Sequence, residues 1–221
     1  MKLLISALVK FICGIALVGC LVFLPAGTLA FWNGWLLMGL LFVPIFILGA
    51  VLFIKQPDLL KKRLNGKEKQ GEQKQVVALS ALVFLAGFVV SGLDYRFNLT
   101  DIPIIGVVAA AALFLLSYAL YAEVMKENSY LSRTIEVHEG QKTIEDGLYG
   151  IVRHPMYFAT VLMFLSIPVI LGSLLGFLIF LAYPFIIAKR IKNEEKLLSA
   201  QLEGYEQYTK KVKYRLFPFI W

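Results

Sequence analysis

A cation, an imidazole and a proline stand together immediately before one of the apolar segments of this chain. They are Arg153, His154 and Pro155, and the apolar run 156–171 follows them. Proline suits the first turn of a helix because its missing N–H costs nothing there. The free N–H groups of such a turn can bind a carboxylate or a phosphate. The pattern therefore predicts an anion-binding position at the start of a helix.

Two adjacent carboxylates and an arginine follow the next apolar run, residues 174–188. Arg190 and Glu194 are four residues apart, so they would share one face of a helix, and Glu195 comes directly after them. One interpretation is a surface ion pair just beyond a membrane span, which would stabilise the protein little. The other is a carboxylate at the end of a helical hairpin, facing the cation and the imidazole at its start.

The second interpretation gives the hairpin a chemistry. Gly172-Ser173 separates the two apolar runs, as in a tight turn. The carboxylates at the end of the hairpin would then bind a positive group of a ligand. The Arg153-His154 pair at its start would bind a negative group of the same ligand. A small zwitterion with an extra positive centre, such as S-adenosylmethionine, fits this arrangement, with its adenine against apolar walls.

The composition indicates that these segments lie in a membrane. The chain has 221 residues, of which 59% are hydrophobic, and its mean hydropathy is +0.74. These values are too high for a soluble domain. Six spans are expected, at roughly residues 5–27, 36–54, 76–93, 104–122, 156–171 and 174–188. The predicted fold is an all-α polytopic membrane bundle of about six transmembrane helices.

We expect one structural unit with two parts. Residues 1–122 would form a four-span scaffold, and residues 123–221 a loop, a helical hairpin and a cytoplasmic tail that together build the cofactor site. The net charge of +7 does not point to nucleic acid, because membrane proteins collect basic residues on the cytoplasmic side. Cys13 and Cys20 would share one helix face at best, so we expect packing residues and no metal site.

The distribution of basic residues predicts the orientation. With six spans and both termini inside, the inner segments hold 21 of the 22 Lys and Arg residues, and only Arg96 falls outside. The positive-inside rule therefore places both termini and the Arg153-His154 stretch in the cytoplasm. The connector 55–75 carries seven of these residues, which would be solvated or contact anionic lipid head groups.

Several short motifs follow one another in the last hundred residues. They are Gly147-Leu148-Tyr149, Val152-Arg153-His154-Pro155 with Tyr157, Arg190 with Glu194-Glu195, Gly204-Tyr205 with Tyr208, and the closing stretch Val212–Pro218. As an ordered set they resemble the isoprenylcysteine carboxyl methyltransferase family, whose wider group includes phospholipid N-methyltransferases. Two positions depart from the family pattern: Gln141 stands where many members have His, and Leu148 where bacterial members often have Pro.

The resemblance implies an integral membrane methyltransferase that uses S-adenosylmethionine and acts on a lipid-like or prenylated substrate. It implies cofactor contacts from Gln141, Tyr149, His154, Pro155, Tyr157 and Glu194, and catalytic roles for Arg153, Arg190 and Glu195. Arg153 would orient the carboxylate of the substrate or of the cofactor. Glu195 would hold Arg153 or Arg190 in place, or act as a base.

The sequence leaves the reaction open. Carboxyl O-methylation of an isoprenylcysteine-like group needs no base, whereas amine N-methylation of a phospholipid does. A membrane reductase of the sterol type, using NADPH, has a similar C-terminal region and is a second alternative. A transporter is the third, but no internal repeat is evident, and the spans carry no ionisable residue of the Asp, Glu, Lys or Arg type except Lys10.

Overall fold

We describe a computed structural model of the chain, in which residues 2–64, 71–128, 130–131, 137 and 140–221 are described. The part of the basic connector at 65–70 lies outside these residues. Within them the chain is helical and contains no β-strand. The helices are α1 (Lys2–Ala26), α2 (Trp32–Lys55), α3 (Pro57–Leu64), α4 (Gly71–Phe97), α5 (Ile104–Glu127), the 3-10 helix η1 (Gly147–Gly150), α6 (Pro155–Ile170), α7 (Leu174–Phe180), α8 (Tyr183–Gln201) and α9 (Tyr205–Lys211).

Five helical segments in the described part of the chain are long and apolar enough to cross a membrane. They are Leu3–Ala26, Trp32–Lys55, Gln73–Phe97, Ile104–Glu127 and Leu174–Gln201. These segments make the chain an integral membrane protein with an all-helical fold, as predicted. The predicted span at 156–171 corresponds to α6, which has 16 residues. At about 1.5 Å per residue it is about 24 Å long, short of a hydrocarbon core of about 30 Å, so the sixth full span stays unconfirmed.

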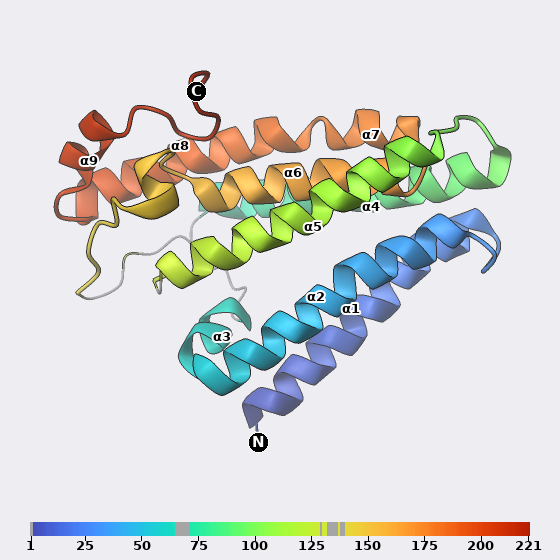
Figure 1. Cartoon of the computed structure of the whole chain (residues 1–221), viewed down its shortest axis with the longest axis horizontal. Coiled ribbons are helices and arrows are strands. Elements are labelled where there is room, and N and C mark those ends of the chain that lie inside the picture. Colours follow the sequence, from blue (N-terminus) through green and yellow to red (C-terminus); the bar gives the residue numbers. More distant parts are fainter. Residues whose placement is uncertain (1, 65–70, 129, 132–136, 138–139) are drawn as a thin grey trace.

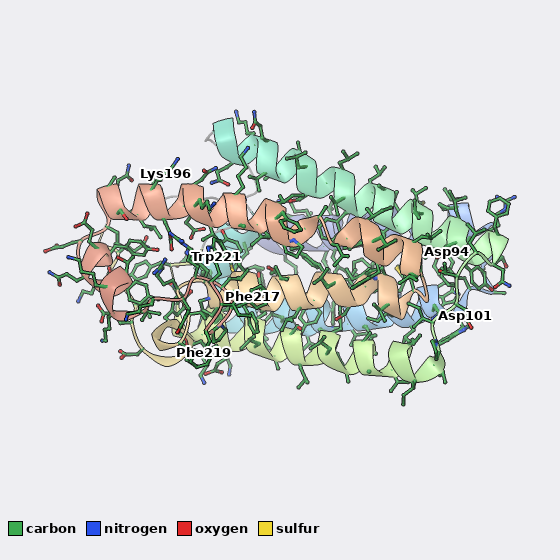
Figure 2. The ribbon with its side chains drawn as sticks, turned by 90° about the horizontal axis from the view of Figure 1, so that it is seen from above. Asp94, Asp101, Lys196, Phe217, Phe219 and Trp221 are labelled. Atoms are coloured by element: carbon green, nitrogen blue, oxygen red, sulfur yellow. The ribbon has the colours of Figure 1, made fainter. Side chains whose placement is uncertain are left out.

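The long helices run side by side, and the loops gather at the two ends of the bundle (Figure 1). The loops after α1, α4 and α6 lie at one end. The start of α6, the end of α8, α3 and α9 lie at the other. Figure 2 shows the same two ends of the bundle, with Asp94 and Asp101 at the first end and Lys196 toward the second. The start and the end of the C-terminal hairpin are therefore on the same side, as the sequence predicted.

Helix α4 lies against both α1 and α7 because small residues let the backbones approach. A Cβ atom on Gly92 would come within 2.7 Å of the Val22 carbonyl oxygen in α1. A Cβ atom on Gly87 would collide with the ring of Phe180 in α7. Close contact through small residues is a common way for helices to pack in a membrane, where hydrophobic burial gives little driving force between them.

A polar network fixes the turn of the hairpin at the end of the bundle remote from α9. Gly172 has a φ of +75°, which favours glycine, and Ser173 caps α7 by accepting from the Gly176 N–H at 2.9 Å. The Ser173 hydroxyl donates to the buried carboxylate of Asp94 in α4. Thr100 donates to the same carboxylate through its N–H at 2.8 Å and through its hydroxyl. The network thus joins α4, the loop before α5, and the α6–α7 turn.

The second arm of the hairpin is longer than the sequence predicted. The expected apolar segment ended at residue 188, but the helical rod formed by α7 and α8 continues to Gln201, with only a short irregularity before Tyr183. This continuation carries Arg190, Glu194 and Glu195 on a rigid element. The ribbon of α8 extends past the first residue of α6, beyond the start of the shorter helix (Figure 1).

Candidate active site

A pocket lies over the first turn of α6, in the space that this short helix leaves between α5 and α8. Its cavity volume is about 100 Å³. The end of α5, residues 130–131 and 141–144, η1, α6, α8 and α9 all contribute to its wall. The polar and aromatic lining residues are Asn128, Tyr130, Gln141, Lys142, Thr143, Tyr149, Arg153, His154, Tyr157, Arg190, Glu194, Tyr205 and Tyr208, and the apolar ones are Leu131, Ile144, Met156, Leu198 and Leu202.

One wall of the pocket combines a carboxylate, a guanidinium and a phenol. The Tyr157 hydroxyl donates to Glu194 Oε2 at 2.5 Å and accepts from Arg190 Nε at 2.9 Å. The guanidinium carbon of Arg190 lies 5.9 Å from the centre of the Tyr157 ring, and the His154 ring stacks on the same tyrosine at 5.7 Å. The wall therefore offers a negative and a positive group a few ångströms apart, both facing the cavity.

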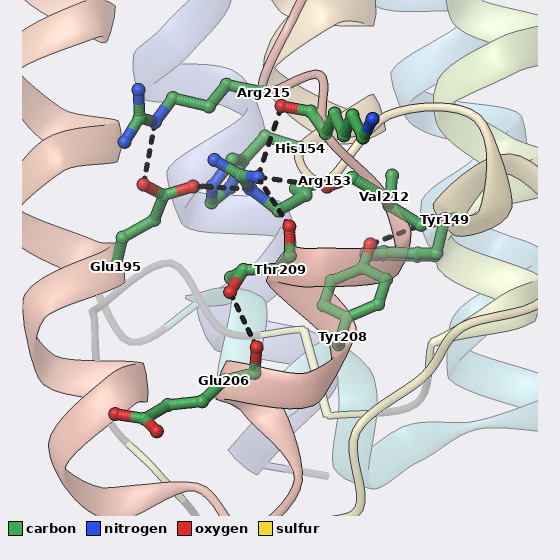
Figure 3. Close-up of polar contacts among 10 residues, drawn as sticks. Tyr149, Arg153, His154, Glu195, Glu206, Tyr208, Thr209, Val212 and Arg215 are labelled. Atoms are coloured by element: carbon green, nitrogen blue, oxygen red, sulfur yellow. Dashed lines mark hydrogen bonds and ion pairs between the residues drawn. The ribbon is translucent and has the colours of Figure 1, made fainter.

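Behind this wall, Glu195 contacts the side chains of Arg153, His154 and Arg215 at once (Figure 3). Its Oε1 accepts from Arg153 Nε at 2.7 Å and lies 3.3 Å from His154 Nε2, and its Oε2 accepts from Arg215 Nε at 2.7 Å. The Glu195 side chain is only 11% exposed and that of Arg153 is 7% exposed. Since both carboxylate oxygens are occupied, this geometry suits Glu195 to holding Arg153 and His154 in place.

The C-terminal tail completes the surroundings of Arg153. Its Nη1 donates to the Val212 carbonyl at 2.9 Å and to the Lys213 carbonyl at 3.2 Å. The backbone N–H of Arg153 donates to the Tyr214 carbonyl, and that of His154 to the Arg215 carbonyl, both at 2.9 Å. Most donors of Arg153 are thus used by the protein, which fixes the imidazole beside it.

The Gly-Leu-Tyr turn is fastened to the end of α5. Gly147 has a φ of +60°, and a side chain at this position would collide with the carboxylate of Glu127, which accepts from the Leu148 N–H at 3.1 Å. Asn128 Nδ2 donates to the Tyr149 hydroxyl at 2.9 Å. Glycine is needed here both for the backbone conformation and for this close approach. The result is that the Tyr149 ring is held in the pocket wall.

Burial raises the pKa of three tyrosines of the wall, Tyr149, Tyr205 and Tyr208, and so further favours their neutral form. The Tyr208 hydroxyl donates to the Tyr149 carbonyl at 2.8 Å. The buried Tyr205 hydroxyl has no hydrogen-bond partner among the described residues. An unpaired buried hydroxyl costs about 1–3 kcal/mol, so this group is a natural contact for a ligand.

The structure brings together most of the residues that the sequence singled out. Gln141, Tyr149, Arg153, His154, Tyr157, Arg190 and Glu194 line the pocket. Pro155 begins α6, as predicted, but it and Glu195 are not among the lining residues. The expected meeting of the two ends of the hairpin is confirmed by the contacts between Glu195 and the Arg153-His154 pair.

Sequence reasoning missed two contributors to this region. Asn128 was not singled out, although an amide at the end of a helix is a recognised capping type. Arg215 had been noticed only as part of the closing motif, and no spacing in the sequence relates it to Glu195, because the tail folds back over the pocket. Tyr205 and Tyr208, which belong to one of the motifs in the sequence, both lie in the pocket lining.

The fold and the pocket define an integral membrane protein with a polar, tyrosine-rich cavity at one end of a helical bundle. Residues 104–203 match the family model described as phospholipid methyltransferase. The matched region runs from the start of α5 through α8. It contains Tyr157, Arg190 and Glu194, whereas Tyr205, Tyr208 and Arg215 lie beyond it.

Two curated proteins are also similar to parts of the chain. A Delta(14)-sterol reductase of Methylotuvimicrobium alcaliphilum is 26% identical over 136 residues, which is 55% of this chain and 32% of the relative. A Delta(14)-sterol reductase of Mus musculus is 30% identical over 91 residues, which is 40% of this chain and 22% of the relative. The chain therefore covers less than a third of either relative.

Proposed function

We propose that this protein is a membrane methyltransferase that uses S-adenosylmethionine to methylate a lipid-like or prenylated substrate. The observation that carries the proposal is the wall formed by Glu194, Tyr157 and Arg190, within the segment that matches phospholipid methyltransferases. The amino-acid portion of the cofactor carries one ammonium and one carboxylate. Glu194 offers a partner for the first and Arg190 for the second.

The remaining lining groups also fit this cofactor. Gln141 and the Tyr205 hydroxyl can hydrogen-bond polar edges of the adenosine, and Leu198 and Leu202 provide apolar contacts for its base. The rings of Tyr157 and His154 offer a face to a sulfonium cation. The role of this chain is then to orient the two reactants and to exclude water, which are the main contributions to a displacement reaction with a neutral leaving group.

When bound, S-adenosylmethionine would supply a methyl group on a sulfonium sulfur, whose carbon–sulfur bond breaks as the nucleophile bonds to the methyl carbon, so that neutral S-adenosylhomocysteine is released. A carboxylate nucleophile needs no base for this step, and an amine nucleophile does. Glu194 is the one carboxylate among the described lining residues, and the proposal assigns it to the cofactor. This favours carboxyl O-methylation of an isoprenylcysteine-like group over amine N-methylation.

The proposed orientation puts both termini and the pocket in the cytoplasm. The supporting feature is the accumulation of Lys and Arg in the segments at the pocket end of the bundle. The water-soluble cofactor would then reach the pocket from the cytosol, while a lipophilic substrate would reach it from the bilayer.

The test is cofactor binding to the purified full-length protein. S-adenosylhomocysteine should raise the thermal unfolding temperature of the wild type, and calorimetry should give at least a tenfold loss of affinity for Glu194→Gln and for His154→Ala, since removing a hydrogen bond to a charged group costs about 1.5–3 kcal/mol. Glu203→Gln, an exposed acid just beyond α8, is the matched control and should bind as the wild type does. Unchanged affinity in both site variants would contradict the proposal.

A membrane reductase is the second candidate, favoured by the similarity to two Delta(14)-sterol reductases. Thermal unfolding with each cofactor distinguishes the two functions. Stabilisation by NADPH, with none by S-adenosylhomocysteine, would replace the methyltransferase proposal with the reductase. In that case phosphate groups would contact lining cations such as Arg190 and Lys142.

A further inference from the structure

Arg63 is a cation that the proposed function does not use, although its side chain reaches the outer side of the pocket wall. It belongs to α3, outside the segment that matches the methyltransferase family. Its guanidinium carbon lies 5.3 Å from the centre of the Tyr121 ring in α5, and its Nη2 lies 3.4 Å from the sulfur of Met156 in α6. Met156 is itself a lining residue of the pocket.

The donors of this guanidinium are poorly satisfied. Its Nε is buried and has no hydrogen-bond partner among the described residues. Its Nη2 points at a thioether, which is a weak acceptor. Within the described part of the chain no carboxylate lies within 4.0 Å of it. Burial raises the pKa of Tyr149, and the nearby positive charge of Arg63 acts on the same pKa in the opposite direction.

The position of α3 places this cation at the edge of the membrane. Helix α3 begins two residues after the end of α2, one of the membrane-spanning helices. Leu59 and Leu60 are buried against Leu52 and Met125, which fixes α3 against the bundle, while Lys61 is exposed. A second cation is close, because the Lys10 ammonium donates to the Leu64 carbonyl at the end of α3. The guanidinium therefore lies near the end of a membrane-spanning helix, where lipid head groups are expected.

We infer that Arg63 binds the oxyanion of an anionic lipid head group, beside the outer wall of the pocket. A guanidinium binds a phosphate or carboxylate through two parallel N–H donors, and a half-buried position strengthens each of these bonds. The lipid's oxyanion would approach the two Nη groups at the end of the guanidinium, because Nε is buried. Resting on the proposed function, this site selects lipids with an acidic group and brings them next to Met156 and Tyr149.

The experiment uses the purified full-length protein in neutral detergent. Phosphatidylglycerol is the anionic probe, phosphatidylcholine the zwitterionic one, and inorganic phosphate the free oxyanion, with thermal unfolding and native mass spectrometry as measurements. Wild-type protein should retain phosphatidylglycerol and be stabilised by it. Arg63→Gln should weaken this binding at least tenfold. Lys61→Gln, an exposed neighbour on the same helix, should bind as the wild type does, and Arg63→Lys, which keeps the charge but not the fork of donors, should fall between the two.

Several outcomes would overturn the inference. Equal lipid binding by Arg63→Gln and the wild type would remove Arg63 from the site. Stabilisation by phosphatidylcholine equal to that by phosphatidylglycerol would mean that the site does not distinguish the charge of the head group. Stabilisation by inorganic phosphate equal to that by phosphatidylglycerol would mean that the site binds free anions. If Arg63→Gln does not fold, equal binding by Arg63→Lys and the wild type would count against the two-donor contact. Binding of S-adenosylhomocysteine by Arg63→Gln is measured in parallel, so a failure of the lipid site and a failure of the proposed function give different results.

Discussion

At the scale of single residues, the buried hydroxyl of Tyr205 is the group in the pocket lining whose hydrogen bonding best supports the proposal of a bound ligand. The residue is 4% exposed and lines the cavity, yet its hydroxyl has no partner among the described residues. Its neighbour Tyr208 uses its own hydroxyl to hold Tyr149. The two tyrosines thus have different roles: Tyr208 stabilises the pocket wall, whereas the hydroxyl of Tyr205 can donate a hydrogen bond to a ligand.

This difference makes a prediction for Tyr205→Phe. The variant removes an unpaired buried group, so the ligand-free protein should unfold at the same temperature as the wild type or a higher one. If the hydroxyl binds the cofactor, the affinity for S-adenosylhomocysteine should fall about tenfold, or about 1.4 kcal/mol. Calorimetry measures both quantities. Tyr208→Phe is the comparison and should lose stability. A Tyr205→Phe protein with undiminished affinity would remove this hydroxyl from the site.

At the scale of the elements, Glu195 joins three parts of the chain that are distant in sequence. It lies on α8 and binds Arg153 and His154 before α6, together with Arg215 in the tail. Removing one partner of a buried ion pair leaves an uncompensated charge and costs about 3–5 kcal/mol. Glu195→Gln should therefore lower the free energy of unfolding by about that amount.

The tail should respond together with the stability. Because Arg215 and the backbone of residues 214–215 are fixed to the same cluster, Glu195→Gln should make the segment after α9 more sensitive to limited proteolysis. Glu203→Gln again serves as the control. Wild-type protection of the tail in Glu195→Gln, with wild-type stability, would show that the tail is held by its backbone hydrogen bonds alone.

At the scale of the whole molecule, the two ends of the bundle have separate tasks. The end with the Asp94 network fixes the turn between α6 and α7, and the opposite end holds the pocket. Asp94 is 1% exposed and accepts from two residues, Thr100 and Ser173. Asp94→Ala should lower the free energy of unfolding by about 1–3 kcal/mol, because buried donors lose their acceptor.

The affinity for S-adenosylhomocysteine should change little in Asp94→Ala, since the contacts around Tyr157 and Glu195 remain. Asp101→Ala, which alters an exposed acid in the loop after α4, should leave both stability and affinity unchanged. Thermal unfolding and calorimetry on the same preparations measure the two effects. A large loss of affinity with little loss of stability in Asp94→Ala would mean that the turn acts on the pocket along the length of the hairpin.

Much of the fold could be predicted from the sequence because membrane spans and helix starts are local features. Apolar runs located the long helices, and Pro155 located the start of α6. The differences concern lengths. Helix α6 has only 16 residues, so the sixth full span stays a prediction, and α8 continues past residue 188, because charged helix formers extend a helix beyond the bilayer. The division at residue 122 stays a prediction.

The sequence by itself determined the helical membrane fold, the hairpin and the set of polar residues at its two ends, since each depends on composition and short spacing. Only the tertiary structure decided which of these residues face the cavity. It gave Glu194 to the pocket and Glu195 to the cluster behind it, because adjacent helix positions point about 100° apart and each meets what the neighbouring elements bring. It also added Arg215 and Arg63, which come from segments that no local pattern connects to the hairpin.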